Sequence, residues 1–155
     1  MNFNNELKYL LHTVPIFEGL ENDELETLSN YLVPKELPMG GLVCKEGQHA
    51  NFLCFVTSGQ LDVGKKLDDS EVNIATIEEG GTMGEMALID GLTRSATVRA
   101  KIASTVLLLR REEFDQILEK HPEIGIKILK GIARVMSLNL RKASAQITAY
   151  MTMSQ

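Results

Sequence analysis

Hydrophobic and polar positions follow three successive patterns along the chain. Apolar residues recur every three or four positions over residues 2–13 and again over 21–32, which is the spacing of amphipathic helices. Pro15 and Pro34 follow these two stretches, and a proline disfavours helical backbone in the residue before it. We therefore predict two N-terminal helices within residues 1–33.

Beyond residue 34 the apolar positions change to the short alternating runs typical of strands. Glycine, aspartate and serine turns separate six such runs, at 41–45, 52–57, 60–65, 71–77, 93–100 and 104–109. Strands at this spacing indicate a sandwich or barrel, because no stretch between them offers the crossover helix that a parallel sheet needs. The pattern predicts a mainly β fold with flanking helices, in which a β-roll of the jelly-roll type occupies residues 35–110.

Helical spacing returns at residue 111. A helix over 111–119 is followed by Pro122, and a longer helix is expected from residue 123 to about 150. One apolar stripe along the longer helix comprises Leu129, Ile132, Met136, Ala143, Ile147 and Tyr150. Because no shift in composition and no internal repeat divides the chain, residues 1–155 are interpreted as one domain with two C-terminal helices over 111–150.

Composition and charge narrow the class of protein. The chain has 155 residues, of which 44% are hydrophobic, so it can bury a core without disulfides. A net charge of −5 argues against a protein that coats nucleic acid. Residues 1–122 hold 11 basic and 20 acidic side chains, whereas 123–155 hold five basic and one acidic. We interpret the basic segment as a solvated helix face, with a nucleic-acid patch as the alternative.

No sequence feature directs the chain to a membrane or marks a metal centre. Because it lacks both an export leader and a run of about 18 apolar residues, the cytoplasm is the expected compartment. Cys44 and Cys54 lie in alternating apolar segments and are interpreted as buried thiols, with a disulfide or metal pair as the alternative. The histidines are far apart and no nucleophile–base arrangement is evident, so we expect neither a metal site nor an enzyme.

Residues 80–98 carry the informative chemistry. Glycines precede a one-turn helix expected near Gly84, and a helix start presents free N–H groups to an anion. Glu85 can accept a hydrogen bond from a hydroxyl, Arg94 offers a fork that matches a phosphate, and Ser95 adds a hydroxyl. This set indicates a nucleotide or sugar-phosphate site. An ion pair between Glu85 and Arg94 is the structural alternative.

The whole stretch resembles the phosphate-binding cassette of cyclic nucleotide-binding domains. The family pattern is Gly-Glu, an apolar residue, Ala-Leu, a variable link, then Arg, a small residue, Ala, and Thr or Ser. The chain reads Gly84-Glu85-Met86-Ala87-Leu88 and then Arg94-Ser95-Ala96-Thr97. Phe17-Glu18-Gly19-Leu20 is similar to the entry motif of the family, and the last two helices are similar to its B and C helices.

The resemblance implies a role for each cassette residue. Glu85 would accept from the ribose 2′-hydroxyl, and Arg94 would pair with the cyclic phosphate. Ser95 would bind the phosphate or reach the base. Gly84 and Met86 would offer backbone contacts near the ribose and the phosphate. With the base contact described next, the candidate ligand-binding residues are Gly84, Glu85, Met86, Ala87, Arg94, Ser95, Ala96 and Asn139.

The resemblance also implies that a residue on the last helix caps the base. Counted from Pro122, Asn139 occupies that position, and an amide can both donate to and accept from a base edge. A single Asn on an apolar stripe can instead set the register of a helix pair. Both roles for Asn139 stay open.

Two functions are consistent with these patterns. The first is a sensor that binds cyclic AMP, with cyclic GMP as the second candidate, and signals through its C-terminal helix to a second copy or an unidentified effector protein. The second is a dimerising or docking scaffold that no longer uses the pocket. Because the chain ends at Gln155, directly after the last helix, we expect no helix-turn-helix and no direct DNA binding.

Overall fold

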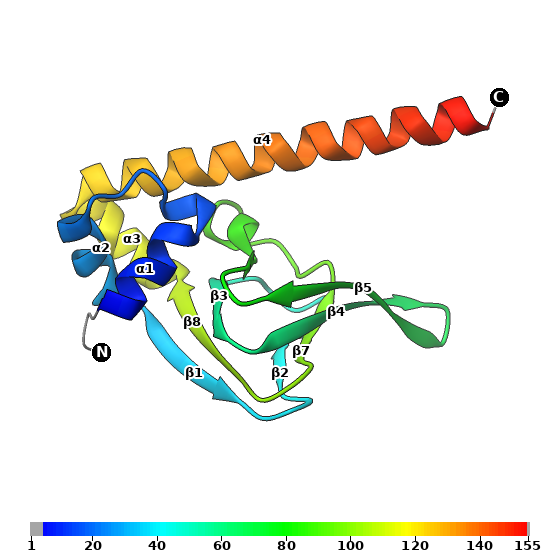
Figure 1. The fold of residues 1–155 in the computed structure, drawn as a ribbon, viewed down its shortest axis with the longest axis horizontal. Helices are drawn as coiled ribbons and strands as arrows, with labels where there is room; N and C mark the ends of the chain where they lie inside the picture. The colour runs from blue at the N-terminus through cyan, green and yellow to red at the C-terminus, as the bar shows by residue number, and fades with distance from the viewer. Residues whose placement is uncertain (1–4, 155) are drawn as a thin grey trace.

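Two four-stranded sheets enclose a core, and a group of helices closes one end of them (Figure 1). The structure is a computed structural model and describes residues 5–154. Residues 2–4 of the predicted first helix, Phe3 among them, lie outside the described residues. The N-terminal helices lie beside the start of the last helix at one end of the sheets, and the last helix runs from there toward the opposite end of the molecule (Figure 1).

Every strand pairing is antiparallel, which confirms the predicted mainly β fold. The first sheet has the order β1-β8-β3-β6, formed by Val33–Leu37, Ser104–Arg110, Phe52–Ser58 and Thr82–Met83. The second sheet has the order β2-β7-β4-β5, formed by Leu42–Cys44, Thr97–Ala100, Gln60–Leu67 and Ser70–Glu78.

Three details of the sheets differ from the sequence prediction. β1 was not predicted, because Pro34 lies within it; β1 is an edge strand, where the missing N–H of a proline is tolerated. β6 has two residues, too few to show alternation. The predicted strand 93–100 is regular only from Thr97 onward, and Thr93 forms an isolated bridge with His49.

The helices agree closely with the predicted periodicity, except for one helical turn at Pro15–Phe17 that the sequence pattern does not predict. They are α1 (Asn5–Thr13), η1 (Pro15–Phe17), α2 (Asn22–Ser29), η2 (Glu85–Leu88), α3 (Arg111–Lys120) and α4 (Pro122–Met153). Their apolar faces pack with one end of the first sheet in a core that includes Phe17, Phe114 and Ile128. A second core lies between the sheets and contains Cys44 and Cys54. Both cysteines are buried and free, as predicted.

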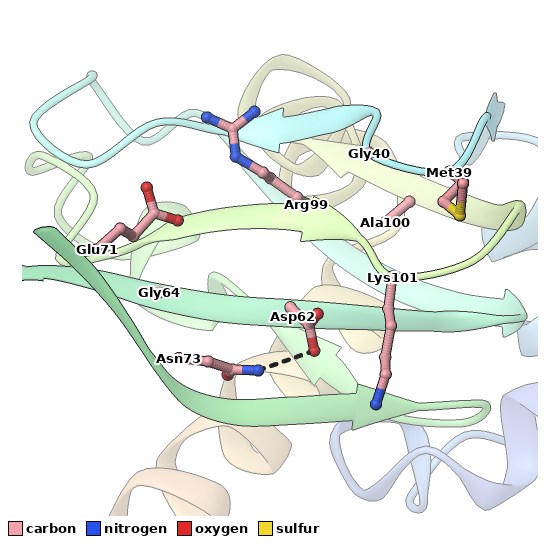
Figure 2. Close-up of a pocket in the computed structure, with 9 residues that line it drawn as sticks. All are labelled: Met39, Gly40, Asp62, Gly64, Glu71, Asn73, Arg99, Ala100 and Lys101. Carbon is pink, nitrogen blue, oxygen red and sulfur yellow. Dashed lines mark hydrogen bonds between the residues drawn. The ribbon is translucent and has the colours of Figure 1, made fainter.

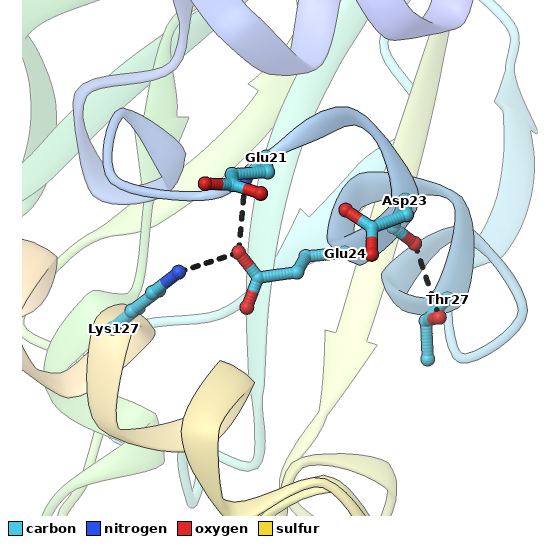
Figure 3. Close-up of polar contacts among 5 residues, drawn as sticks. All are labelled: Glu21, Asp23, Glu24, Thr27 and Lys127. Atoms are coloured by element: carbon cyan, nitrogen blue, oxygen red, sulfur yellow. Dashed lines mark hydrogen bonds and ion pairs between the residues drawn. The ribbon is translucent and has the colours of Figure 1, made fainter.

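Polar contacts join α4 to the N-terminal helices. The carboxylate of Glu24 accepts from the backbone N–H of Glu21, which caps α2, and also from Lys127 Nζ at 2.6 Å (Figure 3). About two turns further along α4, Arg134 Nη1 and Glu18 Oε2 lie 3.3 Å apart. The Glu24 carboxylate thus stabilises the start of α2 and also holds α4 beside it.

Close packing of the α4 backbone against the backbone of η1 also holds α4 in place. A Cβ at Gly131 would meet the carbonyl group of Ile16, whose carbon lies 2.7 Å from that position. Beyond Met136 the side chains of α4 are exposed, and this half of the helix projects past the rest of the molecule (Figure 1). No helix of residues 5–154 is long and apolar enough to cross a membrane.

Candidate functional site

The cassette forms one wall of a cavity of about 380 Å³ against the inner face of the second sheet. Seven of the predicted residues line it, namely Gly84, Glu85, Met86, Ala87, Arg94, Ser95 and Ala96. Val63 and Val98 form an apolar floor, and Ala50 and Leu92 lie at its sides. The cavity therefore combines an apolar surface with a few convergent polar groups, the usual composition of a small-molecule site.

Gly84 allows the cassette to approach Arg94 closely. Its φ of +84° is left-handed, a conformation that glycine adopts without strain, and it precedes η2. A Cβ at this position would collide with Arg94 Nη1 and would lie 2.8 Å from the carbonyl oxygen of Phe52. The glycine is therefore required both for the turn and for the position of the arginine.

Arg94 is a buried cation with unused hydrogen-bonding capacity. It is 7% exposed, its Nη2 donates to the Phe52 carbonyl at 2.6 Å, and its guanidinium carbon lies 4.4 Å from the centre of the Phe52 ring. Its Nε has no hydrogen-bond partner. Burial lowers the pKa of Arg94, although the charges of neighbouring groups, including Glu85, oppose this effect. Arg94 therefore keeps a donor that no group of the described residues satisfies.

Glu85 does not neutralise Arg94 by direct contact. Within residues 5–154 the ion pairs involve other side chains, and Glu85 is partly exposed at the cavity wall. The structure therefore does not support the alternative that these two residues form a structural ion pair. Instead, a carboxylate and a guanidinium face the same cavity and can bind different parts of one ligand.

The loop before β3 holds the cassette backbone in place through hydrogen bonds. The backbone N–H of Arg94 donates to Gln48 at 2.7 Å, and the N–H of Gly47 donates to the Arg94 carbonyl at 2.9 Å. The Thr97 hydroxyl accepts from the Glu46 N–H at 3.0 Å. The segment around Glu46 thus fixes the backbone on both sides of Arg94.

Sequence reasoning missed Phe52 and placed Asn139 where the cavity does not reach. Phe52 is 42 residues from Arg94 and lies outside the cassette pattern, so residue spacing along the chain does not pair the two. Asn139 lies on the exposed half of α4 and is not among the residues that line the cavity. Its predicted contact with a base stays a prediction.

Both cysteines have the environment of protonated thiols. Burial raises the pKa of Cys54 to about 12 and also raises that of Cys44, which lines the cavity. A thiol must lose its proton to bind a metal, so neither is prepared for that role. The described part of the chain holds no group of three or more His, Cys, Asp or Glu side chains that could hold a metal ion.

A second hollow, of about 340 Å³, lies on the outer face of the same sheet (Figure 2). Arg99 and Lys101 share it with Asp62 and Glu71, and Asp62 already accepts hydrogen bonds from Asn73 and Thr76. Arg99, Lys101 and Glu71 are exposed to solvent. Because charges of both signs are solvated here, this hollow lacks the buried and unpaired cation that distinguishes the cassette cavity.

Comparison with known proteins agrees with this geometry. The family model of the cyclic nucleotide-binding domain matches residues 34–121. Glutaminase 1 of Bradyrhizobium diazoefficiens is 33% identical over 86% of this chain, which corresponds to 21% of that enzyme. The chain spans 21% to 35% of the length of this and three further curated relatives.

Solved structures show the same fold. A cyclic nucleotide-binding domain from Methylobacillus flagellatus superposes with a TM-score of 0.80 at 25% identity, over 94% of this chain and 82% of that one. The regulatory domain of Toxoplasma gondii protein kinase A, crystallised with cyclic AMP, superposes with a TM-score of 0.68 at 26% identity, over 75% and 46% of the two chains. The chain is a jelly-roll in which a glycine–glutamate turn lies opposite a buried arginine, and it belongs to the cyclic nucleotide-binding domain family.

Proposed function

We propose that the chain is a regulatory module that binds cyclic AMP in the cassette cavity. The observation that carries this proposal is the Arg94 guanidinium, which is buried at the cavity wall, forms no ion pair among the described residues and leaves its Nε without a partner. A phosphate oxygen supplies the charged acceptor that this group lacks, and charge-assisted hydrogen bonds of this kind are among the strongest in proteins. Arg94 is thus assigned to the cyclic phosphate.

The other cassette residues complete the ligand contacts. Glu85 accepts from the ribose 2′-hydroxyl, and Ser95 donates to the phosphate. Gly84 and Met86 contribute backbone groups. Ala87 and Ala96 have small side chains, which leave space for the ligand to approach the cavity wall. This assignment is supported by the position of all six residues around one cavity with Arg94.

Cyclic AMP is favoured over cyclic GMP. Support comes from the Toxoplasma regulatory domain, which has 26% identity to this chain and was crystallised with cyclic AMP. The apolar floor of the cavity, which includes Val63 and Val98, suits the purine face of either nucleotide and does not distinguish them. Asn139 is the candidate to reach the base edge, and this contact requires α4 to move toward the cavity.

We propose that ligand binding is transmitted to a partner through α4. Apolar residues along its projecting half recur at spacings of four and three, as in a coiled coil, at Met136, Leu140, Ala143, Ile147 and Tyr150. Leu140 and Ile147 are 70% and 60% exposed. A second copy of this chain, or an effector with a matching helix, would cover this stripe. If the ligand binds more tightly when α4 is in one of two positions, binding shifts the population of molecules toward that position.

Calorimetric titration with cyclic AMP and cyclic GMP tests the binding proposal. We expect both to bind, cyclic AMP more tightly, and Arg94→Ala to lose about 2–5 kcal/mol of binding free energy because the phosphate is left unpaired. Arg99→Ala is the matched control, since Arg99 lies on the other face of the same sheet in the second hollow, and it should bind like the parent. Absence of heat and of a thermal shift with either nucleotide would overturn the proposal.

The exposed stripe on α4 favours one further candidate, a scaffold that dimerises without ligand. Sedimentation of the purified chain with and without cyclic AMP separates the two functions. A dimer whose stability is independent of the nucleotide, together with an absence of binding, would establish the scaffold. A nucleotide-dependent change would establish the sensor.

A further inference from the structure

The position of Arg94 depends on an aromatic residue outside the cassette. Phe52 is the first residue of β3, and it contacts the guanidinium twice, through its carbonyl oxygen at 2.6 Å and through its ring face at 4.4 Å. Phe52 is partly buried against the core between the sheets, so its ring has a fixed place. The guanidinium thus lies close to both this ring and Gly84.

The chemistry of this contact differs from that of an ion pair. A carboxylate partner would hold the arginine but would also cancel its charge before any ligand arrived. A ring face and a carbonyl attract the cation without carrying a negative charge, so the full positive charge remains available to an anion. Within the described residues no ion pair includes Arg94, and its Nε is unpaired.

We propose that Phe52 is a positioning residue that preorganises Arg94 for the phosphate. This inference rests on the proposed function and extends it to a residue that the cassette motif does not contain. The arginine is buried and oriented before binding, so binding does not require its long side chain to be ordered. The ring thereby sets how tightly the cavity holds the phosphate.

Replacement of the ring tests this role. Phe52→Leu keeps the backbone carbonyl and an apolar side chain of similar bulk but removes the ring face, and it should weaken cyclic AMP binding about tenfold. Phe52→Tyr keeps the ring and should bind within about twofold of the parent. Tyr31→Leu is the matched control, because Tyr31 is a half-buried aromatic residue that contacts His121 away from the cavity, and it should leave affinity unchanged.

Nuclear magnetic resonance of the Arg94 Nε–H group gives a second measurement that needs no nucleotide. The signal is assigned by its loss in Arg94→Lys. In the ligand-free parent we expect it to be displaced by the ring current of Phe52 and protected from exchange with water. Phe52→Leu should move it toward the position of a free arginine and speed its exchange, whereas Tyr31→Leu should not.

The results separate two kinds of failure. If the parent binds neither nucleotide, the proposed function fails, and the Nε–H signal still reports whether the ring holds the arginine. If the parent binds and Phe52→Leu binds equally well, the role of Phe52 is overturned. A loss in Phe52→Leu that Phe52→Tyr shares would also overturn it, because the ring would then be irrelevant.

Discussion

Gly84 and Arg94 lie so close together that a side chain at residue 84 would displace the arginine. The glycine has a left-handed backbone, and the guanidinium lies where its Cβ would be. Sequence reasoning identified both residues through the cassette pattern, because that pattern is local. It could not identify Phe52, since the contact between Phe52 and Arg94 is created by the fold. At the residue scale, motif residues were predictable and their supporting residues were not.

Gly84→Ala should separate backbone strain from displacement of the arginine. The left-handed backbone alone costs an alanine about 1–2 kcal/mol of stability. The added Cβ must also displace Arg94, so we expect cyclic AMP affinity to fall by more than about tenfold. Chemical denaturation gives the free energy of unfolding, and calorimetry gives the affinity.

Gly40→Ala provides the control for this prediction. Gly40 has a φ of +82°, and a Cβ there would meet nothing within 4 Å. The variant should lose a similar amount of stability and bind like the parent. Equal affinities of the two variants would show that the space beside Gly84 is not needed for binding.

Among the elements, the α-helices and the edge strands of the second sheet were more predictable than the edge strands of the first sheet. The long periodic stripe of α4 and the apolar spacing of α3 gave bounds within a few residues of those observed. β1 and β6 were missed because one carries Pro34 and the other is two residues long. Pairing with distant segments decides both edges, and the local pattern of apolar and polar residues does not reveal it.

Gly131→Ala should weaken the contact between α4 and η1. An alanine usually stabilises a helix relative to glycine by about 1 kcal/mol. Here the added Cβ would overlap the backbone carbonyl of Ile16, which cannot rotate away, so we expect a net loss of about 1–3 kcal/mol. Gly125→Ala is the comparison, because the atom nearest to its Cβ is the mobile tip of the Leu118 side chain at 2.5 Å. Denaturation in urea should show a smaller loss, or a gain, for Gly125→Ala.

The contact between Glu24 and Lys127 should make stability depend on pH. Burial raises the pKa of Glu24, but hydrogen bonds from Lys127 and from the Glu21 backbone outweigh it and lower the pKa below its ordinary value. A lowered carboxyl pKa adds stability that is present above the pKa of the unfolded chain and disappears as the pH falls through the folded value. The stability difference between the parent and Glu24→Gln should therefore shrink below about pH 4.

Lys127→Met checks the origin of that pH dependence. It removes one of the two donors, so it should show a weaker pH dependence than the parent. The double variant should lose less stability than the two single losses combined, because each single change breaks the same contact. Additive losses at pH 7 would contradict a direct coupling between the two side chains.

For the whole molecule, the distribution of buried surface separates a body from an extension. Residues 5–136 contain both cores, whereas the side chains of α4 beyond Met136 are exposed. The basic charge that the sequence concentrates after residue 122 falls on this helix, including Arg141 and Lys142 on the exposed half. A segment that buries nothing in its own body contributes little to the stability of that body, so its apolar stripe is free to serve an interface.

The stripe on α4 predicts a specific pattern of self-association. Leu140 and Ile147 lie seven residues apart on one helix face, whereas Leu138 is turned about 200° from Met136 and lies on the opposite face. If a second copy covers the stripe, Leu140→Glu with Ile147→Glu should convert a dimer to a monomer in sedimentation, and Leu138→Glu should leave the dimer intact. At protein concentrations where the parent is a monomer, the free energy of unfolding should be the same in all three, since these positions do not contribute to either core. A parent chain that sediments as a monomer with and without cyclic AMP would exclude a second copy as the occupant and leave a helix of an effector protein in its place.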